Sequence, residues 1–152
     1  MTKHEYYISI ALAVSRKSTC LKKQYGAVIV KDDEVVATGY NDTCRKEPHC
    51  KTCTKVPGNG DTEEYLACPA VHAEMNAIIS ASRKEMLGAD LYLAGYDTVT
   101  GKENFDARPC EICLRLIKNA GIDRVINHTG IIYERFAEDG ILYDLKGGKW
   151  YA

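Results

Sequence analysis

The stretch VHAEMNAIISASRKEMLGADLYLAG, residues 71–95, contains the two patterns that decide the fold class. Residues 71–86 combine helical periodicity with good helix formers, and Gly88 follows as a stop signal, so the pattern predicts one helix there. The segment ADLYLAG, residues 89–95, is short, apolar and aromatic, which predicts a strand. A helix that leads into a strand is the repeating unit of an α/β domain.

The same alternation continues on both sides of this stretch. Upstream, apolar residues at helical spacing predict a helix over residues 3–18, and two β-branched runs at 25–30 and 34–40 predict a hairpin. Downstream, residues 108–121 predict a helix with Pro109 in its first turn and Gly121 past its end. A further strand is expected over 123–128. For the tail we expect a short helix in IIYERFAEDG and a strand or turn in ILYDL.

This order predicts a single domain over residues 1–152. We expect an α/β fold with three α-β-α layers around a mixed five-stranded sheet, because helices alternate with strands and the opening hairpin is antiparallel. A polar, Cys-rich loop insert at about 41–68 interrupts the alternation. Loops of this length are uncommon in compact domains unless they have a function.

Composition excludes some partners and favours one compartment. The 152 residues carry 20 basic and 21 acidic side chains, a net charge of -1, which argues against a nucleic-acid partner. No apolar run is long enough to cross a membrane, and the N-terminus lacks the features of a signal peptide. We therefore expect a cytoplasmic protein. Thiols stay reduced there, so seven cysteines, an odd number, indicate metal binding before disulfides.

The motif PCEIC, residues 109–113, supplies half of a candidate metal site. Cys110 and Cys113 are three residues apart on the predicted helix, so their side chains share one face. They lie in its first turn, where the helix dipole favours the thiolate form. Two thiolates at this spacing are half of a tetrahedral zinc site. A redox pair and two small buried residues are the alternatives at this point.

His72 and Glu74 lie in the first turn of the other helix. If the two helices pack side by side on the sheet, His72 joins Cys110 and Cys113 as the third protein ligand. Three protein ligands with an open fourth position are typical of catalytic zinc, whereas structural zinc has four. Glu74 is then a carboxylate beside the metal that is not needed for ligation. This arrangement suits hydrolytic attack on an electrophilic carbon.

These motifs resemble those of a known family. HAE followed by PCxxC is similar to the signature of zinc-dependent nucleobase deaminases. The segments STCLKKQYGAVIVKDDEVVATGYN, PHC, CPAVHAEMNAI and LIKNAGIDRVI resemble the cytidine/deoxycytidylate (dCMP) deaminase family, over about residues 15–127. Asn76 makes the motif more similar to the dCMP branch than to tRNA adenosine deaminases. The resemblance implies a cytidine-deaminase-like fold and a homo-oligomer.

The resemblance also implies residue roles. His72, Cys110 and Cys113 would bind a catalytic Zn²⁺, and Glu74 would carry a proton from the zinc-bound water to the pyrimidine N3 and then to the leaving ammonia. Attack at C4 would convert dCMP to dUMP. The backbone N–H groups of Ala73 and Cys110 would stabilise the developing charge. Asn41 would contact the sugar or base, although a turn-forming Asn after a strand is equally consistent with its position.

The near-neutral charge disfavours a nucleic-acid editor as an alternative, and two other functions remain open from the residues. One is deamination of another small substrate: cytidine, a modified pyrimidine or a pterin-like base. The other is a non-catalytic, zinc-stabilised module, which the presence of Glu74 disfavours because such a module needs no extra carboxylate beside its histidine.

The remaining cysteines suggest a second metal. PHCKTC, residues 48–53, is a CxxC motif within a loop, which is a ligand-like spacing. The resemblance implies a second, structural zinc bound by Cys20, Cys50 and Cys68. Cys53 is our choice for the fourth ligand, with Cys44 and His49 as alternates. A set of unconnected thiols is the other interpretation.

The sequence departs from the family pattern at two loops. The segment GYDTVTGKENFDAR, residues 95–108, adds about a dozen residues before PCEIC, and Asp42 replaces the more usual glycine after GYN. Both positions fall on loops expected to contact substrate. A nucleotide monophosphate would need cations. The basic residues near these loops are interpreted first as solvated surface charges and are not assigned to the site; they are Lys22, Lys23, Arg45, Lys46 and Arg108.

Overall fold

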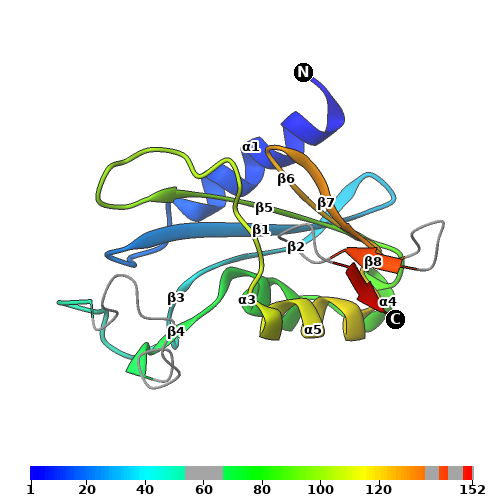
Figure 1. Ribbon diagram of the computed structural model, residues 1–152. Helices are drawn as coiled ribbons and strands as arrows, with labels where there is room; N and C mark the ends of the chain where they lie inside the picture. Colours follow the sequence, from blue (N-terminus) through cyan, green and yellow to red (C-terminus); the bar gives the residue numbers. More distant parts are fainter. Residues whose placement is uncertain (54–66, 136–140, 144–148, 152) are drawn as a thin grey trace.

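The computed structural model describes residues 1–53, 67–135, 141–143 and 149–151. Its centre is a five-stranded sheet in the order β2-β1-β5-β6-β7 (Figure 1). The strands are β1 (Lys23–Lys31), β2 (Glu34–Tyr40), β5 (Asp90–Asp97), β6 (Arg124–Asn127) and β7 (Gly130–Glu134). β5 and β6 are parallel and the other neighbours are antiparallel. The predicted mixed five-stranded sheet is confirmed.

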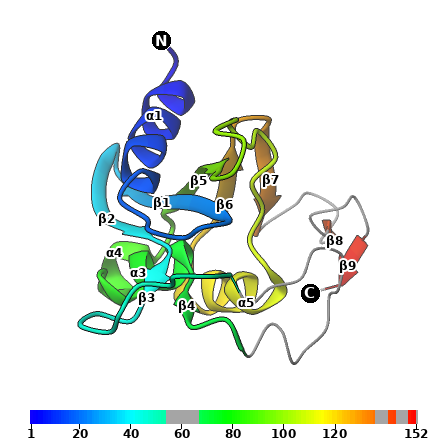
Figure 2. The ribbon, with the colours of Figure 1, turned by 90° about the vertical axis from the view of Figure 1, so that its left-hand side faces the viewer.

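Helices cover both faces of this sheet, as Figure 2 shows. α1 (Lys3–Ser15) lies on one face; α3 (Ala73–Ile79), α4 (Arg83–Met86) and α5 (Glu111–Ala120) lie on the other. Alternation along β1 separates the two cores, because Val28 and Val30 pack beneath α1 while Ala27 and Ile29 pack against α3 and α5. The predicted three-layer α-β-α arrangement is therefore confirmed.

Two pairs of short strands lie outside the central sheet. β3 (Asp42–Thr43) pairs with β4 (Ala70–Val71), which joins the two ends of the Cys-rich insert. β8 (Ile141–Tyr143) pairs with β9 (Lys149–Tyr151). The part of the insert from 54 to 66 lies outside the described residues.

The single helix predicted over residues 71–86 is wrong, because the segment forms two helices. α3 ends at Ile79, and Ser82 caps the N-terminus of α4. The Ser82 hydroxyl accepts from the Glu85 backbone N–H at 3.2 Å, and the Glu85 carboxylate accepts from the Ser82 N–H at 2.8 Å. This capping box begins a new helix inside a continuous helical pattern.

Two other predicted boundaries need correction. Cys110 is the N-cap of α5, so Pro109 precedes the helix instead of occupying its first turn. The Cys110 sulfur accepts from the Cys113 backbone N–H at 3.4 Å, which makes it the capping group. The helix expected in 131–140 is also wrong for its first residues, which form β7 and pair with β6. Tyr133, 3% exposed, packs against the core, so tertiary burial overrides the local pattern.

A glycine in β2 sets the position of α3. A β-carbon at Gly39 would overlap the backbone oxygen of Ala73 and the backbone nitrogen of Ala77. Glycine therefore lets α3 lie directly on β2, and so fixes the place of the residues at the start of that helix.

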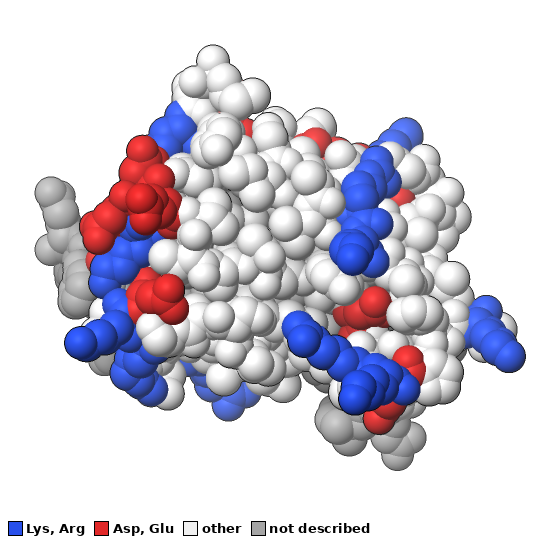
Figure 3. All heavy atoms as spheres, turned by 180° about the vertical axis from the view of Figure 1, so that it is seen from behind, with Lys and Arg blue, Asp and Glu red and all other residues white. Residues whose placement is uncertain are grey.

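The surface adds two observations about partners. On the face shown in Figure 3, basic side chains lie in separate groups with acidic side chains among them, so this face has no continuous basic surface. None of the helices in the described residues is long and apolar enough to span a bilayer.

Candidate active site

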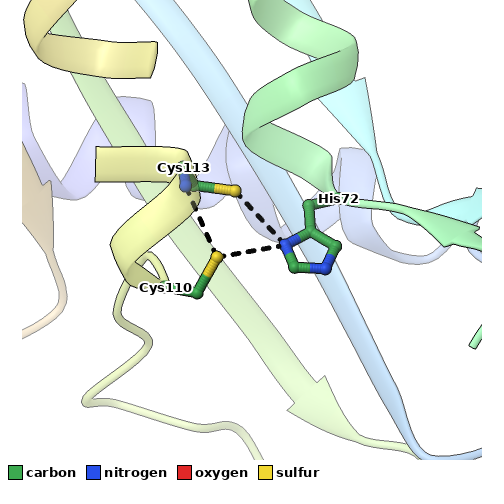
Figure 4. Close-up of side chains that lie close together, drawn as sticks. All are labelled: His72, Cys110 and Cys113. Carbon is green, nitrogen blue, oxygen red and sulfur yellow. Dashed lines mark hydrogen bonds between the residues drawn. The ribbon is translucent and has the colours of Figure 1, made fainter. Parts of the chain in front are cut away.

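Three predicted metal ligands meet at the N-terminal ends of α3 and α5 (Figure 4). His72 Nδ1 lies 3.2 Å from Cys113 Sγ and 3.5 Å from Cys110 Sγ. The three donor atoms all lie within 4.8 Å of one another. The structure therefore brings together His72, Cys110 and Cys113, as the sequence predicted.

Local structure explains this convergence. His72 is the N-cap of α3, with an extended backbone, and Cys110 is the N-cap of α5. α5 buries one face, formed by Cys113, Leu114, Ile117 and Ala120, against the same side of the sheet that α3 covers. Because the two helices are neighbours, their first turns present the three side chains to one another.

The chemistry of this donor set fits a zinc ion. Two cysteine sulfurs and one imidazole are the soft and borderline ligands that tetrahedral zinc prefers. The hydrogen bond with Cys110, burial, and the nearby carboxyl of Glu74 together raise the pKa of the Cys113 thiol well above its ordinary value. A divalent cation held by the three donors would favour the thiolate instead, because thiolate is the metal-binding form.

Glu74 lies in the wall of a pocket beside these donors. The His72 pocket, a cavity of about 230 Å³, is lined by His72, Glu74 and Cys110 among others. Glu74 is 5% exposed, and its burial raises the pKa of its carboxyl. It is not part of the three-residue donor group. The pocket therefore holds a buried carboxyl next to a metal-binding group, as a proton-transfer site requires.

The two predicted substrate contacts also line the His72 pocket. Ala73 is fully buried in its wall, and Asn41 is 7% exposed. The Asn41 amide is already engaged with β1: its Oδ1 accepts from the Tyr25 N–H at 2.8 Å, and its Nδ2 donates to the Lys23 carbonyl at 2.8 Å. Asn41 thus holds the end of β2 against β1, and its contact with substrate stays a prediction.

The four cysteines predicted for a second metal line a small cavity next to the His72 pocket, and Cys20, Cys53 and Cys68 border both. This Cys-rich pocket, about 30 Å³, is bordered by Cys20, Cys50, Cys53 and Cys68. Burial and the neighbouring thiols raise the pKa of Cys50. Within the described residues, however, His72, Cys110 and Cys113 are the one group of three donors close enough to share an ion. Neither alternate for the fourth ligand lines this cavity: Cys44 is exposed, and the His49 ring forms a hydrogen bond with the Thr19 hydroxyl.

Sequence reasoning missed several residues of the His72 pocket. Tyr25 lines it, and its hydroxyl accepts from Asn104 Nδ2 at 3.3 Å. Leu93 of β5 and Ala70 of β4 complete part of the wall. These residues carry ordinary strand patterns, so no local signal marks them as pocket residues.

Comparisons with known proteins agree with the site. Residues 1–129 match the family described as "Cytidine and deoxycytidylate deaminase zinc-binding region". The deoxycytidylate deaminase of Mycobacterium phage D29 is 37% identical over 80% of this chain and 91% of its own length. The deoxycytidylate deaminase of Schizosaccharomyces pombe is 32% identical over 82% of this chain. This chain spans only about a third, 36%, of the length of that relative.

A solved structure supports the same assignment. The dCMP deaminase of the cyanophage S-TIM5, crystallised with dCMP and dUMP, superposes with a TM-score of 0.56 at 25% identity, over 80% of this chain and 77% of that one. The family match covers most of the chain and includes His72, Cys110 and Cys113. The protein is therefore a member of the cytidine and deoxycytidylate deaminase family.

Proposed function

We propose that the protein catalyses the hydrolytic deamination of dCMP to dUMP and ammonia. The observation that carries this proposal is Glu74, a buried carboxyl that lines the His72 pocket beside the zinc-binding group without belonging to it. The relatives named deoxycytidylate deaminase, and the related structure that holds dCMP and dUMP, support the choice of substrate.

His72, Cys110 and Cys113 hold the zinc ion in this proposal. A bound zinc ion would supply Lewis-acid chemistry there, making a water molecule easier to deprotonate. Glu74 accepts a proton from the attacking water and transfers it to N3 of the cytosine as the C4–O bond forms. Glu74 then moves the proton of the new C4 hydroxyl to the amino group, and the C4–N bond breaks as the C4=O bond forms, so that ammonia leaves. The raised pKa of its carboxyl suits a group that must both accept and donate protons.

The test is turnover of dCMP by the purified protein, with CMP, dCTP, deoxycytidine and cytidine beside it, followed by the loss of cytosine absorbance. Glu74→Gln should lower kcat at least about 100-fold and keep bound zinc, because general acid–base catalysis contributes this much and Glu74 is not a ligand. Glu34→Gln, at an exposed site at the start of β2, is the matched control. Retained activity in Glu74→Gln would refute the proton-transfer role.

We propose in addition that Cys20, Cys50, Cys53 and Cys68 bind a second, structural zinc. The small volume of the Cys-rich pocket suits one ion, and a closed site would order the insert, which has little apolar content. Metal analysis should find about two zinc per chain, falling to about one in Cys50→Ser. Cys44→Ser, at an exposed cysteine outside both pockets, should keep two. One zinc per chain in the unchanged protein would contradict this site.

We also propose a cytoplasmic homo-oligomer. None of the seven cysteines forms a disulfide, which suits a reducing compartment. Exposed apolar side chains on neighbouring helices, Ile79 of α3 with Ile112 and Leu116 of α5, are the surface that association would cover.

A further inference from the structure

Tyr25 of β1 contributes a phenol to the wall of the His72 pocket. Its side chain is partly buried and packs against the core on the side of the sheet that α3 and α5 cover. Glu74 lines the same pocket. Zinc binding and proton transfer by Glu74 use no phenol, so Tyr25 is a polar group of the pocket that the proposed mechanism leaves without a role.

The backbone of Tyr25 is held in place by Asn41. The Tyr25 N–H donates to Asn41 Oδ1 at 2.8 Å, and the Tyr25 carbonyl accepts from the Asn41 N–H at 3.3 Å. Asn41 Nδ2 donates to the Lys23 carbonyl at 2.8 Å. Asn41 therefore uses its side chain to place β1, and Tyr25 is the residue of this pair that offers a side-chain hydroxyl to the pocket.

A glycine in β5 makes room for the Tyr25 ring. Gly95 is the cross-strand partner of Tyr25, and a β-carbon at Gly95 would lie 2.6 Å from Tyr25 Cδ1. The connection between β5 and α5 then folds back toward this point (Figure 1), where the Asn104 N–H donates to the Gly95 carbonyl at 2.8 Å. The β5–α5 connection is therefore attached to β5 next to the ring.

Asn104 fixes the role of the Tyr25 hydroxyl. Asn104 Oδ1 accepts from the Asp106 N–H at 3.2 Å, and Asn104 Nδ2 donates to the Tyr25 hydroxyl oxygen at 3.3 Å. Because the hydroxyl accepts in this contact, its own proton is left to donate, and no acceptor for it lies within hydrogen-bond distance in the part of the chain that the structure describes. Burial, with a smaller contribution from the charge of Glu74, raises the pKa of Tyr25, so the phenol keeps this proton at neutral pH.

The cytosine ring carries an acceptor that this proton can meet. C2 and C4 flank N3 in the ring, and Glu74 transfers its proton to N3. With C4 at the zinc-binding group, the C2 carbonyl oxygen lies on the other side of N3, toward the remaining wall of the pocket. Adenine, in contrast, has only a C–H group at the position that corresponds to this carbonyl.

We propose that the Tyr25 hydroxyl donates a hydrogen bond to the C2 carbonyl oxygen of the substrate and makes the pocket selective for a pyrimidin-2-one ring, with Asn104 as the positioning residue. A donor fixed in a pocket wall disfavours a ring without an acceptor, because the donor then loses water and gains no partner. The inference rests on the proposed function and deepens it, because it names a residue that selects the base.

The first test weakens the acceptor and removes the donor in turn. 2-Thio-dCMP differs from dCMP only at the C2 position, where sulfur is a weaker acceptor than oxygen. Tyr25→Phe should lower kcat/KM for dCMP about 10-fold and that for 2-thio-dCMP less than about 2-fold. Tyr6→Phe removes a phenol hydroxyl from a residue that is 51% exposed, so it is the matched control and should change neither. Equal losses for both substrates, or no loss for dCMP, would overturn the proposal.

A second substrate separates the base from the sugar, whose 3′-oxygen is the other acceptor of the nucleoside. 2′,3′-Dideoxy-CMP lacks that oxygen and keeps the C2 carbonyl, so Tyr25→Phe should lower its kcat/KM by the same factor, about 10-fold. If Tyr25→Phe has no effect on this substrate, the hydroxyl contacts the sugar and the proposed base selectivity is refuted.

The positioning role of Asn104 has its own readout. Asn104→Asp places an acceptor beside the hydroxyl, which then donates to the new carboxylate and not to the substrate. The preference for dCMP over 2-thio-dCMP should fall about 10-fold, and any effect of the added charge on the phosphate cancels in this ratio. Asn104→Ala leaves the proton free and should lower the preference only about 3-fold. Neither change should lower the preference further in Tyr25→Phe, and a full additional loss there would show that Asn104 acts independently of Tyr25.

Binding of the product separates this inference from the proposed function. Because dUMP keeps the C2 carbonyl, calorimetry should show dUMP binding that weakens about 10-fold in Tyr25→Phe. Tyr25-dependent dUMP binding without dCMP turnover would uphold the contact and refute the deaminase proposal. Turnover of dCMP that is unchanged in Tyr25→Phe would refute the contact alone. Absence of both dUMP binding and dCMP turnover in the unchanged protein would refute both.

Discussion

Asn41 joins the sheet to the His72 pocket through one buried amide. It sits just after β2, yet its side chain bonds the backbone of β1 on both sides of Gln24. The carbonyl oxygen and the NH2 group of the side-chain amide are both used in these contacts, and the residue also borders the pocket. A substitution at Asn41 therefore distinguishes two roles: loss of the contacts with β1 lowers stability, and loss of a substrate contact raises KM.

Asn41→Ala should lower the free energy of unfolding by about 2 kcal/mol, because two hydrogen bonds are lost and two part-buried backbone groups lose their partner. Urea denaturation measures this change. Asn119→Ala, at an exposed position in α5, should change stability by less than about 0.5 kcal/mol. If Asn41→Ala keeps its stability and its KM for dCMP rises, the main role of the amide is to contact the substrate.

At the same scale, the three candidate metal ligands could be predicted from the sequence, and the contact between Asn127 and Asp106 could not. His72, Cys110 and Cys113 occupy caps and first turns, which short-range spacing reveals. Asn127 reaches Asp106 across 21 residues of sequence, a contact that depends on how β6 meets the inserted connection. No periodicity in either segment carries that information.

Among the elements, α1 is attached to the sheet by a buried phenol. The Tyr7 hydroxyl donates to the Asp33 carbonyl at 2.7 Å and to its carboxylate at 2.8 Å, in the β1–β2 turn. Burial, followed by the hydrogen bond to Asp33, raises the pKa of Tyr7 to about 12 from its ordinary value of 10.0. The folded protein therefore holds the phenolic proton more tightly than the unfolded chain does.

This pKa predicts an alkaline loss of stability. The contribution of Tyr7 is complete below pH 10 and is lost as pH rises toward 12, because the unfolded phenol ionises first. Tyr7→Phe should lower the free energy of unfolding at pH 7 by about 1 kcal/mol and make its decline above pH 10 shallower. Tyr92, whose pKa burial also raises to about 12, retains part of the decline.

Denaturation measured from pH 7 to 11.5 checks this prediction. Tyr6→Phe is the matched control, because the neighbouring Tyr6 is 51% exposed and should leave both the stability and its pH dependence unchanged. An equally steep decline in Tyr7→Phe would place the alkaline transition elsewhere.

The sequence predicts whether most segments are helix or strand, but it does not predict where a helix ends. The residues of α3 and α4 share one helical pattern, and the break between them depends on whether the Ser82 capping box begins a new helix. The Ser82 capping box is visible in the sequence, but the surrounding pattern is equally compatible with a continuous helix. β7 was missed because its pairing with β6 is decided by burial of Tyr133 and not by local propensity.

For the whole molecule, alternation of helices and strands was sufficient to predict three layers, because each apolar pattern has to be buried against another element. The same patterns do not specify which surface stays apolar. Ile79 is 76% exposed, and Ile112 and Leu116 lie one turn apart on the neighbouring helix. Within the described residues these three side chains lie outside the buried core, and we propose that a second copy of the chain covers them.

We therefore expect the protein in solution to have a mass that is a multiple of 16.9 kDa, with this apolar surface at the contact between copies. Ile79→Glu should shift the mass toward the monomer, because association would bury an unpaired charge. Light scattering after size-exclusion chromatography measures the mass. Val99→Glu, at an equally exposed apolar residue on the β5–α5 connection, should leave it unchanged. A monomeric mass for the unchanged protein would contradict the oligomer, and an unchanged oligomer in Ile79→Glu would place the contact on another surface.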